Sequence, residues 1–397
     1  MGVKYISLAE PSGYGIAAKR CILALAHAGI DVTWTPMIGG FEGPPYYRPF
    51  GGTHAGDRDL DPFCNRPIAY DVVIVHTVPE YFPFWIDVER GRTIIGHTVW
   101  ETTAIPAHWR ALLNAVDRLL VPCGWNKTVF EDCGVTVPID VFPHIADDRI
   151  RPVDPSVDRN DGDGYVFYTI GVWSHRKALY CTVQAFCEAF TADDPVTLVI
   201  KTNPDDLTVT GVMRYFRRSV SQAVDRITRR YKRPPRIRLV TDVLSEDAIR
   251  QLHERGDCYV SLCRGEGWGI GAFDAAAYGN PVVMTGFGGQ LDYLDPDAAY
   301  LVDYVLVPVI NPQAPLSYSP DQRWAEPDIR HGARLLREVA ARPELATARG
   351  RALQARVAER FGGRRVTEGL IPVIAAARAT PAVSPASPVQ PTGAARA

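Results

Sequence analysis

The chain has 397 residues, of which 46% are hydrophobic and 22% are charged, and its formal net charge is −2. This length favours two domains, and the composition is that of a globular protein able to bury sizeable cores. A net charge so close to zero excludes a strong whole-chain attraction to nucleic acid or to membranes.

The eight cysteines are scattered, and none forms a C-x-x-C pair, which argues against zinc and redox motifs. Most lie in apolar segments, as reduced core thiols do. The chain enters a strand-like segment at residue 3 without a signal peptide, and no apolar segment approaches the ~20 residues needed to cross a bilayer. We therefore expect a cytoplasmic protein, with peripheral association at a membrane as an open alternative.

Strand and helix signals alternate along most of the chain, and this pattern predicts parallel α/β sheets. In the first half, strands are expected at 3–8, 31–35, 71–76, 93–98, 118–122 and 139–142, with helices at 14–28 and 109–116. In the second half, strands are expected at 165–170, 197–201, 236–240, 258–262, 281–285 and 300–302, with helices at 177–190, 212–231, 246–255 and 272–278. The last helices are expected at about 328–361 and 366–377. The chain thus predicts two Rossmann-like parallel α/β domains.

Composition also suggests where the domains begin and end. Residues 151–164 are polar and rich in proline, glycine and aspartate, as linkers are. We expect an N-terminal domain at 1–155, a C-terminal domain at 163–360, a closing helix at 361–378 and a disordered tail at 379–397. The segment 39–67 is a long irregular loop, and such loops are often functional.

The stretch from Arg264 to Asp274 (RGEGWGIGAFD) carries the strongest chemical signal. It follows an apolar strand and reads as a glycine-rich turn that opens a helix. Alternate glycines let the backbone approach a ligand closely and direct amide groups at it. Glu266 and Asp274 bracket this turn. Amides suit phosphate and carboxylates suit sugar or ribose hydroxyls, so the segment predicts a nucleotide-sugar site.

Arg176 and Lys177 follow the first strand of the second half and precede a helix. Adjacent cations at the mouth of a strand favour a diphosphate site, because arginine supplies a fork of donors and lysine a point charge. The alternative is a solvated helix start. Lys201, at the end of the next strand, has the weaker case, since such a lysine often only caps a strand.

Two further pairs of residues have two interpretations each. Gly13 and Gly15 follow the first strand, either as a tight turn or as a contact to phosphate or acceptor at a helix N-terminus. His97 and Glu101 follow another strand at its carboxyl end, where ligands sit in open α/β sheets, although a lone histidine is often structural. His144 is expected to be structural.

Residues 214–238 contain ten arginines and lysines and one acid, Asp225. One interpretation is a solvated amphipathic helix with Val220, Val224 and Ile227 facing inward. The other is a dock for an anionic acceptor or surface, either nucleic acid or anionic lipid. The small net charge and the lack of aromatic residues among most of these arginines weaken the nucleic-acid case.

Taken together, these residues resemble the retaining GT-B glycosyltransferases of glycosyltransferase family 4. The resemblance covers roughly residues 3–375. Its most specific part is the E-x7-E motif, which stands here as Glu266 to Asp274 and continues with Ala-Tyr-Gly-Asn-Pro-Val-Val. The segment 121–130 (VPCGWNKTVF) also fits the family's first domain. Two departures are an aspartate in place of the second glutamate and Ile145 in place of a glycine.

The resemblance implies a role for each candidate residue. Glu266 would hold hydroxyls of the donor sugar, Asp274 would bind the ribose, and His97 would lie beside the sugar. Arg176 and Lys177 would neutralise the diphosphate. The remaining donor-binding candidates are Gly13, Gly15, Lys201, Arg264, Gly267, Trp268, Gly269 and Ile270.

The resemblance also implies a reaction. A sugar would pass from a nucleotide-diphosphate sugar to an acceptor hydroxyl with retention, in a cleft between the two domains, with no metal, no cofactor and no obligate protein partner. The acceptor is expected to be a glycan or a lipid-linked glycan; a nucleic-acid base or a protein is the alternative. A catalytically inactive nucleotide-sugar-binding module is an alternative of another class, which the intact Glu266, Arg176 and Lys177 disfavour. An epimerase or phosphorylase explains the motif less well.

Overall fold

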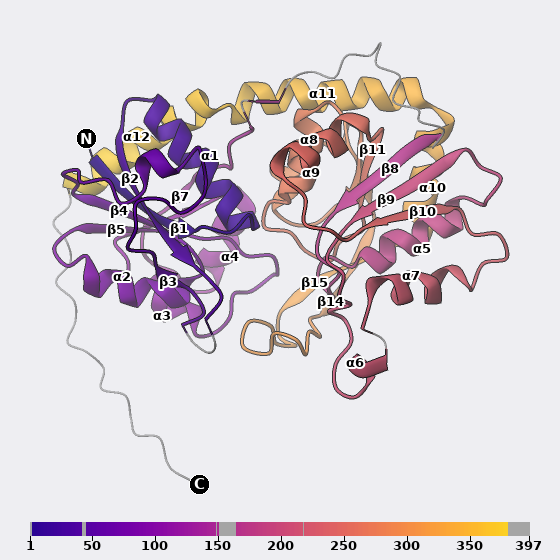
Figure 1. The fold of residues 1–397 in the computed structure, drawn as a ribbon, viewed down its shortest axis with the longest axis horizontal. Helices are drawn as coiled ribbons and strands as arrows, with labels where there is room; N and C mark the ends of the chain where they lie inside the picture. The colour runs from indigo at the N-terminus through magenta and orange to yellow at the C-terminus, as the bar shows by residue number, and fades with distance from the viewer. Residues whose placement is uncertain (1, 42–44, 148, 151–163, 217, 380–397) are drawn as a thin grey trace, which may run out of the picture.

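The computed structural model describes residues 2–41, 45–147, 149–150, 164–216 and 218–379. Two parallel sheets lie side by side, each flanked by helices on both faces (Figure 1). Residues 151–163 of the predicted linker at 151–164 and nearly all of the predicted tail lie outside the described residues. Among the described residues, no helix has both the length and the apolar character that crossing a bilayer requires.

The first sheet has seven strands in the order β3-β2-β1-β4-β5-β6-β7. Six of them run parallel: β1 (Gly2–Leu8), β2 (Asp31–Ile38), β4 (Val72–His76), β5 (Thr93–His97), β6 (Arg118–Val121) and β7 (Ile139–Val141). The short β3 (Arg48–Pro49) pairs antiparallel with β2. The helices of this domain are α1 (Gly13–His27), α2 (Phe82–Val88), α3 (Trp109–Leu113) and α4 (Gly124–Asp132).

The second sheet has six parallel strands in the order β10-β9-β8-β11-β12-β13. They are β8 (Tyr165–Ile170), β9 (Val196–Lys201), β10 (Arg236–Val240), β11 (Cys258–Ser261), β12 (Val282–Thr285) and β13 (Tyr300–Val302). The main helices around them are α5 (Leu179–Ala189), α7 (Val220–Thr228), α8 (Glu246–Arg255), α9 (Ile270–Ala277) and α10 (Ile329–Ala341). An antiparallel pair, β14 (Tyr304–Pro308) and β15 (Arg323–Pro327), lies beside this sheet.

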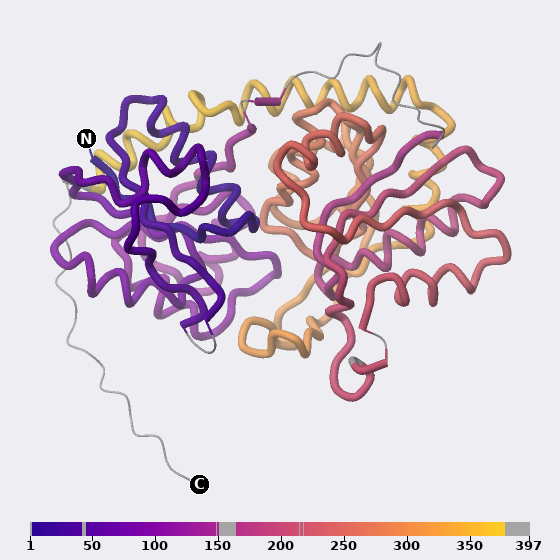
Figure 2. The backbone as a smooth tube through the Cα atoms, viewed as in Figure 1, coloured from indigo at the N-terminus to yellow at the C-terminus, as the bar shows by residue number. Residues whose placement is uncertain are grey.

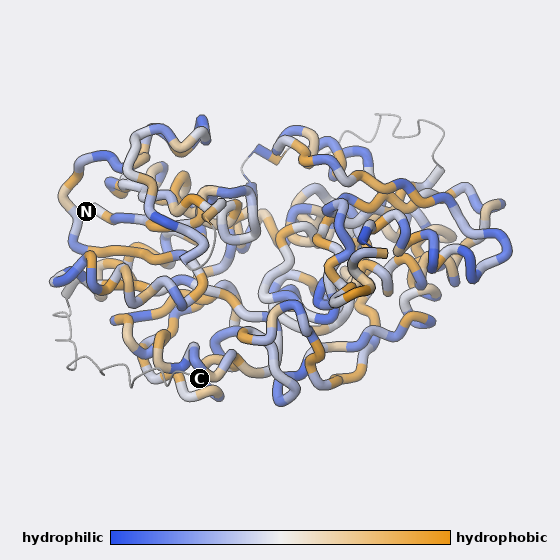
Figure 3. The backbone as a smooth tube through the Cα atoms, turned by 60° about the horizontal axis from the view of Figure 1, so that its bottom comes forward, coloured by the Kyte–Doolittle hydropathy of each residue, from blue (hydrophilic) through white to orange (hydrophobic). Residues whose placement is uncertain are grey.

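Four buried hydrophobic clusters fill the space between sheets and helices, one on each face of each sheet. Side chains alternate along β4, where Val72 and Ile74 face one cluster and Val73 and Val75 face the other. Hydrophobic residues therefore run through the strands of both sheets, while hydrophilic residues gather in the outer turns (Figure 3). Strands buried on both faces are the pattern expected of parallel α/β sheets.

Two helices that were predicted to be continuous are each divided into two in the structure. The predicted helix at 212–231 is two helices, α6 (Met213–Phe216) and α7, because Ser219 is extended and forms a capping box with Gln222. The predicted helix at 328–361 is also two, α10 and α11 (Pro343–Phe361), which meet at Arg342. Pro343 has no amide hydrogen and disfavours a helical conformation in the residue before it.

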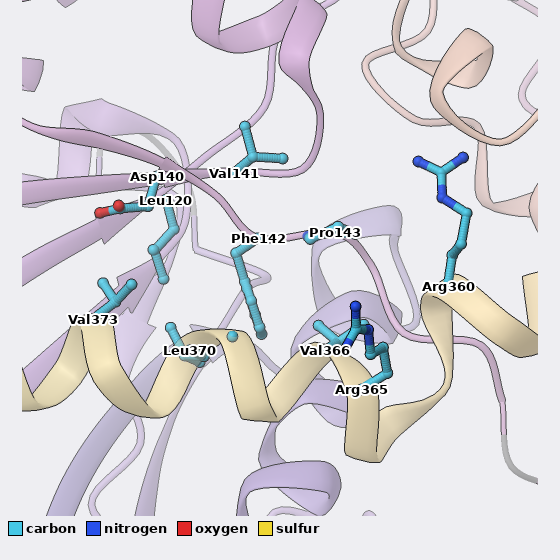
Figure 4. Close-up of a pocket in the computed structure, with 11 residues that line it drawn as sticks. Leu120, Asp140, Val141, Phe142, Pro143, Arg360, Arg365, Val366, Leu370 and Val373 are labelled. Atoms are coloured by element: carbon cyan, nitrogen blue, oxygen red, sulfur yellow. The ribbon is translucent and has the colours of Figure 1, made fainter.

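The last two helices tie the domains together. In Figure 2 the yellow end of the chain runs along the second domain as α11 and then reaches the first domain as α12 (Gly363–Ala379). Figure 4 shows Val366, Leu370 and Val373 of α12 facing Leu120 and Phe142 across a shallow pocket of about 150 Å³. The C-terminal helix thus completes one core of the first domain.

Candidate active site

A cleft of about 1690 Å³ lies between the two domains, beside the carboxyl ends of strands from both sheets. The first domain contributes the start of α1 and the segments that follow β4 and β5. The second contributes the segments after β8, β9 and β10 and the turn that opens α9. Of the predicted site residues, the cleft is lined by Gly13, Arg176, Lys177, Lys201, Glu266, Gly267, Trp268, Gly269, Ile270 and Asp274.

Four charged side chains meet at the centre of the cleft. Lys177 Nζ donates to Glu266 Oε1, and Arg176 Nη1 donates to Glu266 Oε2 at 3.2 Å. Arg176 Nε lies 2.8 Å from Glu101 Oε1, which belongs to the first domain. The structure therefore joins three predicted residues into one cluster and adds Glu101. Two carboxylates and two cations balance there, so the cluster by itself carries no net charge.

Pairing keeps the cluster ionised despite its burial. Burial by itself would raise the pKa of Glu266, but Lys177 and Arg176 outweigh it and hold that pKa below its ordinary value. Burial would likewise lower the pKa of Arg176, but Glu101 and Glu266 raise it instead. Each charge depends on its neighbours, so a ligand that removes one partner must supply another.

The turn that carries these cations has an unusual backbone. Ala178 directly follows Lys177 with φ of 43°, in the left-handed region that residues with a side chain rarely adopt. Its side chain is fully buried, and the amide of Arg264 donates to the carbonyl of Arg176 at 2.8 Å. The predicted helix start at 177 is therefore wrong, since α5 begins at Leu179. A strained backbone conformation of this kind persists only where the surrounding packing fixes the turn.

The N-terminus of α9 opens into the cleft without a side-chain cap. Its N-cap is Gly269, with φ of 86°, and Gly269, Ile270 and Gly271 all line the cleft. The first amides of a helix have no partner within it and carry the positive end of the helix dipole. This end of α9 is therefore suited to bind a phosphate group.

The start of α1 differs, because the chain caps it itself. Ser12 Oγ accepts a hydrogen bond from the amide of Gly15 at 3.3 Å. A Cβ on Gly15 would lie 2.0 Å from the carbonyl oxygen of Glu10, so a tight turn requires glycine there. Gly13 lines the cleft and Gly15 does not. For Gly15 the tight-turn interpretation therefore holds.

Two glycines of the 264–274 segment serve the contact between domains. A Cβ on Gly265 would lie 2.2 Å from the carbonyl oxygen of Glu101, and one on Gly267 would lie 2.0 Å from Val99 Cγ2. Close approach of the first domain is thus a further reason for glycine at these two positions, and approach to a ligand stays a prediction. This packing brings Glu101 to the centre of the cleft.

Asp274 is already paired across the cleft. Arg20 of α1 donates to both of its carboxylate oxygens, at 2.7 and 2.8 Å, and also to the carbonyl of Ile145 at 3.3 Å. Burial would lower the pKa of Arg20, but Asp274 raises it. Beside this pair, Lys19 Nζ donates to Glu246 Oε1 at 2.8 Å. A ribose that used Asp274 would have to compete with Arg20.

Histidines form a buried stack in the first domain. His97 is completely buried and does not line the cleft; its ring stacks on His76 with 3.6 Å between centroids. His76 and His144 line the cleft instead. Burial lowers the pKa of all three, that of His144 to about 3, so the rings are neutral at physiological pH. The structure therefore places His76 and His144, rather than His97, at the cleft.

Arg264 directs its side chain away from the cleft. Arg264 Nε donates to Glu326 Oε2 at 2.7 Å, and its guanidinium lies over the Trp324 ring, so its position argues against a donor contact. Trp268 lines the cleft but is only 2% exposed and packs in the core. Lys201 does line the cleft, and burial lowers its pKa.

No protein-family model and no curated protein matches this chain. Solved structures do match it. HepE of Anabaena in complex with UDP and glucose has a TM-score of 0.67 at 14% identity, over 95% of this chain and 100% of that one. Sucrose-phosphate synthase of Thermosynechococcus elongatus has a TM-score of 0.68 at 14% identity, over 95% and 98%. An E. coli structure described as trehalose-6-phosphate bound with UDP-2-fluoro glucose has a TM-score of 0.62 at 13% identity, over 96% of this chain and 100% of that one.

The protein has the GT-B fold. The predicted fold class, two parallel α/β domains that face a cleft, is thereby confirmed. At such low identities the likeness is one of fold, so family 4 and retention stay predictions.

Three residues that line the GT-B cleft were not predicted as ligands from the sequence: Arg20, His76 and Glu101. Arg20 lies inside a helix, where its spacing carries no motif. His76 ends a strand, as His97 does, and nothing local distinguishes the two. Glu101 was noted only together with His97. Among the described residues, no three histidine, cysteine or acidic side chains form a group that could bind a metal ion.

Proposed function

We propose that this protein is a retaining glycosyltransferase of the family 4 type, which moves a sugar from a nucleotide-diphosphate sugar to an acceptor hydroxyl. The observation that carries the proposal is the cluster of Glu266, Lys177 and Arg176 beside the uncapped end of α9. We assign the donor to the second domain and the acceptor to the first. UDP-sugars are the first donors to test, because HepE was solved with UDP-glucose.

Donor binding would exchange the partners within the cluster. The diphosphate would take Lys177, Arg176 and the first amides of α9, and hydroxyls of the sugar would take Glu266. Every charge that loses a protein partner then gains one from the donor. The diphosphate adds negative charge to a cluster whose own charges balance, and the positive end of the α9 dipole would offset part of that excess.

The same groups would stabilise the transition state. As the bond from the anomeric carbon to the phosphate oxygen breaks, its electron pair stays on the phosphate, where Arg176, Lys177 and the α9 amides face it. The sugar gains oxocarbenium character, as in glycoside hydrolysis. The acceptor oxygen would bond to that carbon on the same face and pass its proton to the departing phosphate. We propose no metal and no cofactor, because these groups already supply positive charge.

The acceptor is proposed to be a glycan or lipid-linked glycan at the cytoplasmic side of the cell. The alternative acceptors, a nucleic-acid base or a protein side chain, have no specific support in the cleft. An inactive nucleotide-sugar-binding module is favoured by one observation: Arg20 occupies both oxygens of Asp274. Turnover separates this possibility from the enzyme.

A thermal-shift panel with UDP-, GDP-, ADP- and dTDP-glucose, with and without EDTA, tests the proposal on the wild type and on Lys177→Ala. We expect one nucleotide class to raise Tm by several degrees in the wild type, independently of EDTA, and to have little effect on the variant. Release of free nucleoside diphosphate from that donor would then demonstrate turnover. No shift with any donor would overturn the donor site, whereas binding without turnover would favour the inactive module.

A further inference from the structure

The short helix α6 and the residue before it present four large apolar side chains to solvent. Val212 and Phe216 are each 71% exposed, Tyr215 is 87% exposed and Met213 is 43% exposed. We call Val212, Met213, Tyr215 and Phe216 the apolar tip. Single exposed apolar residues are ordinary on protein surfaces, but a contiguous group marks an interaction site.

A neighbouring loop extends this apolar surface toward the cleft. The loop joins β14 to β15 and carries Ile310 and Leu316, which are both exposed. Gln313 Nε2 on this loop donates to the carbonyl of Val209 at 2.9 Å, so the loop lies against the segment that leads into α6. Both segments lie at the lower edge of the molecule in Figure 1. Leu316 also lines the cleft, and the apolar surface therefore reaches its mouth.

An exposed cation stands next to the apolar tip. Arg218, just after α6, has a side chain that is 70% exposed, whereas the exposed Arg229 and Arg230 lie at the far end of the nine-residue α7. Arg218 contacts Asp205 at 3.3 Å, but both side chains are exposed, so this pair contributes little. Arginines beside inserted apolar residues match anionic lipid headgroups, which attract basic segments while the acyl boundary takes apolar side chains.

The size and the residue types of this surface favour a membrane over a protein partner. A stable protein–protein interface uses about 20–30 residues a side, whereas the apolar tip and its neighbouring loop offer six. Tyrosine is enriched at the membrane–water interface, since its ring is apolar and its hydroxyl polar. A small projecting group of this kind suits shallow insertion among headgroups.

We propose that the apolar tip docks the second domain onto an anionic lipid bilayer, with Tyr215 and Phe216 inserted at headgroup depth. This inference goes beyond the proposed function, because docking requires neither donor nor acceptor. The mouth of the cleft beside Leu316 would then lie close to the bilayer, where a lipid-linked acceptor is presented; that last step alone rests on the proposed function.

Sedimentation with vesicles tests the docking. We expect the wild type to bind vesicles of phosphatidylcholine with phosphatidylglycerol, to bind pure phosphatidylcholine weakly, and to lose binding as salt increases. The variant Tyr215→Ser/Phe216→Ser should bind at least ~10-fold more weakly. The matched control is Val141→Ser/Leu345→Ser, which changes two exposed apolar residues on β7 and α11 and should bind as the wild type does.

Equal binding by the tip variant and the wild type would overturn the proposal, as would absence of wild-type binding to anionic vesicles. The thermal shift with nucleotide sugars is measured on the same samples. Because the tip variant changes only exposed side chains, it should keep that shift. Loss of vesicle binding with the shift retained supports docking, and loss of the shift in the wild type contradicts the proposed function instead.

Discussion

Two regions of the cleft hold the two acids of one motif in different ways. Around Glu266, the strongest partners, Lys177 and Arg176, come from the same domain. Around Asp274, the partner is Arg20 from the opposite domain. A ligand can therefore reach Glu266 by local exchange of partners, but it can reach Asp274 only by breaking a contact between domains. The sequence motif presents the two acids as equivalent ligands, but their ion-pair partners in the structure differ in which domain they come from.

The largest effect expected from a single substitution comes from breaking the contact at Asp274. Arg20→Ala would leave a mostly buried carboxylate without its cation, and we expect it to lower the free energy of unfolding by about 3 kcal/mol, as for a buried pair that loses one member. Urea denaturation measures this. The double variant Arg20→Ala/Asp274→Asn should recover part of the loss, because the uncompensated charge is gone. A double variant no more stable than Arg20→Ala would show that the pair is not coupled.

The next effect concerns Glu266 and its partners. Glu266→Ala and Lys177→Ala should each lower the rate of sugar transfer at least ~100-fold, equal to about 2.7 kcal/mol of transition-state stabilisation. Initial rates with the donor found by thermal shift measure it. Lys201→Ala is the matched control, a cleft lysine outside the cluster, and it should have a clearly smaller effect. Near-normal rates in both cluster variants would contradict the assignment of the site.

Lowering the pH should distinguish the contribution of the buried histidines to stability from that of the carboxylate cluster. His76, His97 and His144 have a lowered pKa in the folded state, so the unfolded chain binds more protons below pH 6.5, and stability falls as pH drops from there. Each such histidine contributes a slope of about 1.4 kcal/mol per pH unit. Glu266, whose folded pKa is also lowered, loses its contribution only below about pH 4.5. Urea midpoints between pH 7.5 and 5 should therefore report the histidines, and His76→Asn should flatten the slope.

The smallest expected effect lies at the strained turn after Lys177. Ala178→Gly should raise the free energy of unfolding by about 0.5 kcal/mol, because relief of a left-handed backbone, roughly 1–2 kcal/mol, exceeds the added freedom of the unfolded chain. Ala185→Gly on α5 is the control; it is buried and helical, so glycine should cost about 1 kcal/mol there. If both variants are destabilised equally, the backbone of Ala178 is not strained.

The fold could be predicted from the sequence because the apolar strands alternate with helices in both halves. The predicted helices at 212–231 and 328–361 missed two breaks that local signals mark, since Ser219 and Gln222 have the spacing of a capping box and Pro343 stands at the start of α11. The position of Glu266, Arg176 and Lys177 at the cleft could be predicted, because each of them lies in a short local motif that follows a strand. Arg20 and Glu101 could not be assigned, because their roles come from packing between domains that no local pattern reports.

The path of the last helix has a consequence for how the chain is made. Val366, Leu370 and Ile374 of α12 are buried in the same core as Ile22 and Leu25 of α1. A ribosome that has synthesised the whole first sheet has therefore not yet supplied the helix that covers this core. Domains often fold one after another during synthesis, but here the first domain must wait, with apolar surface uncovered, until α12 has been translated, which begins at Gly363, long after β7 ends at Val141. This interval is when a chaperone would be needed.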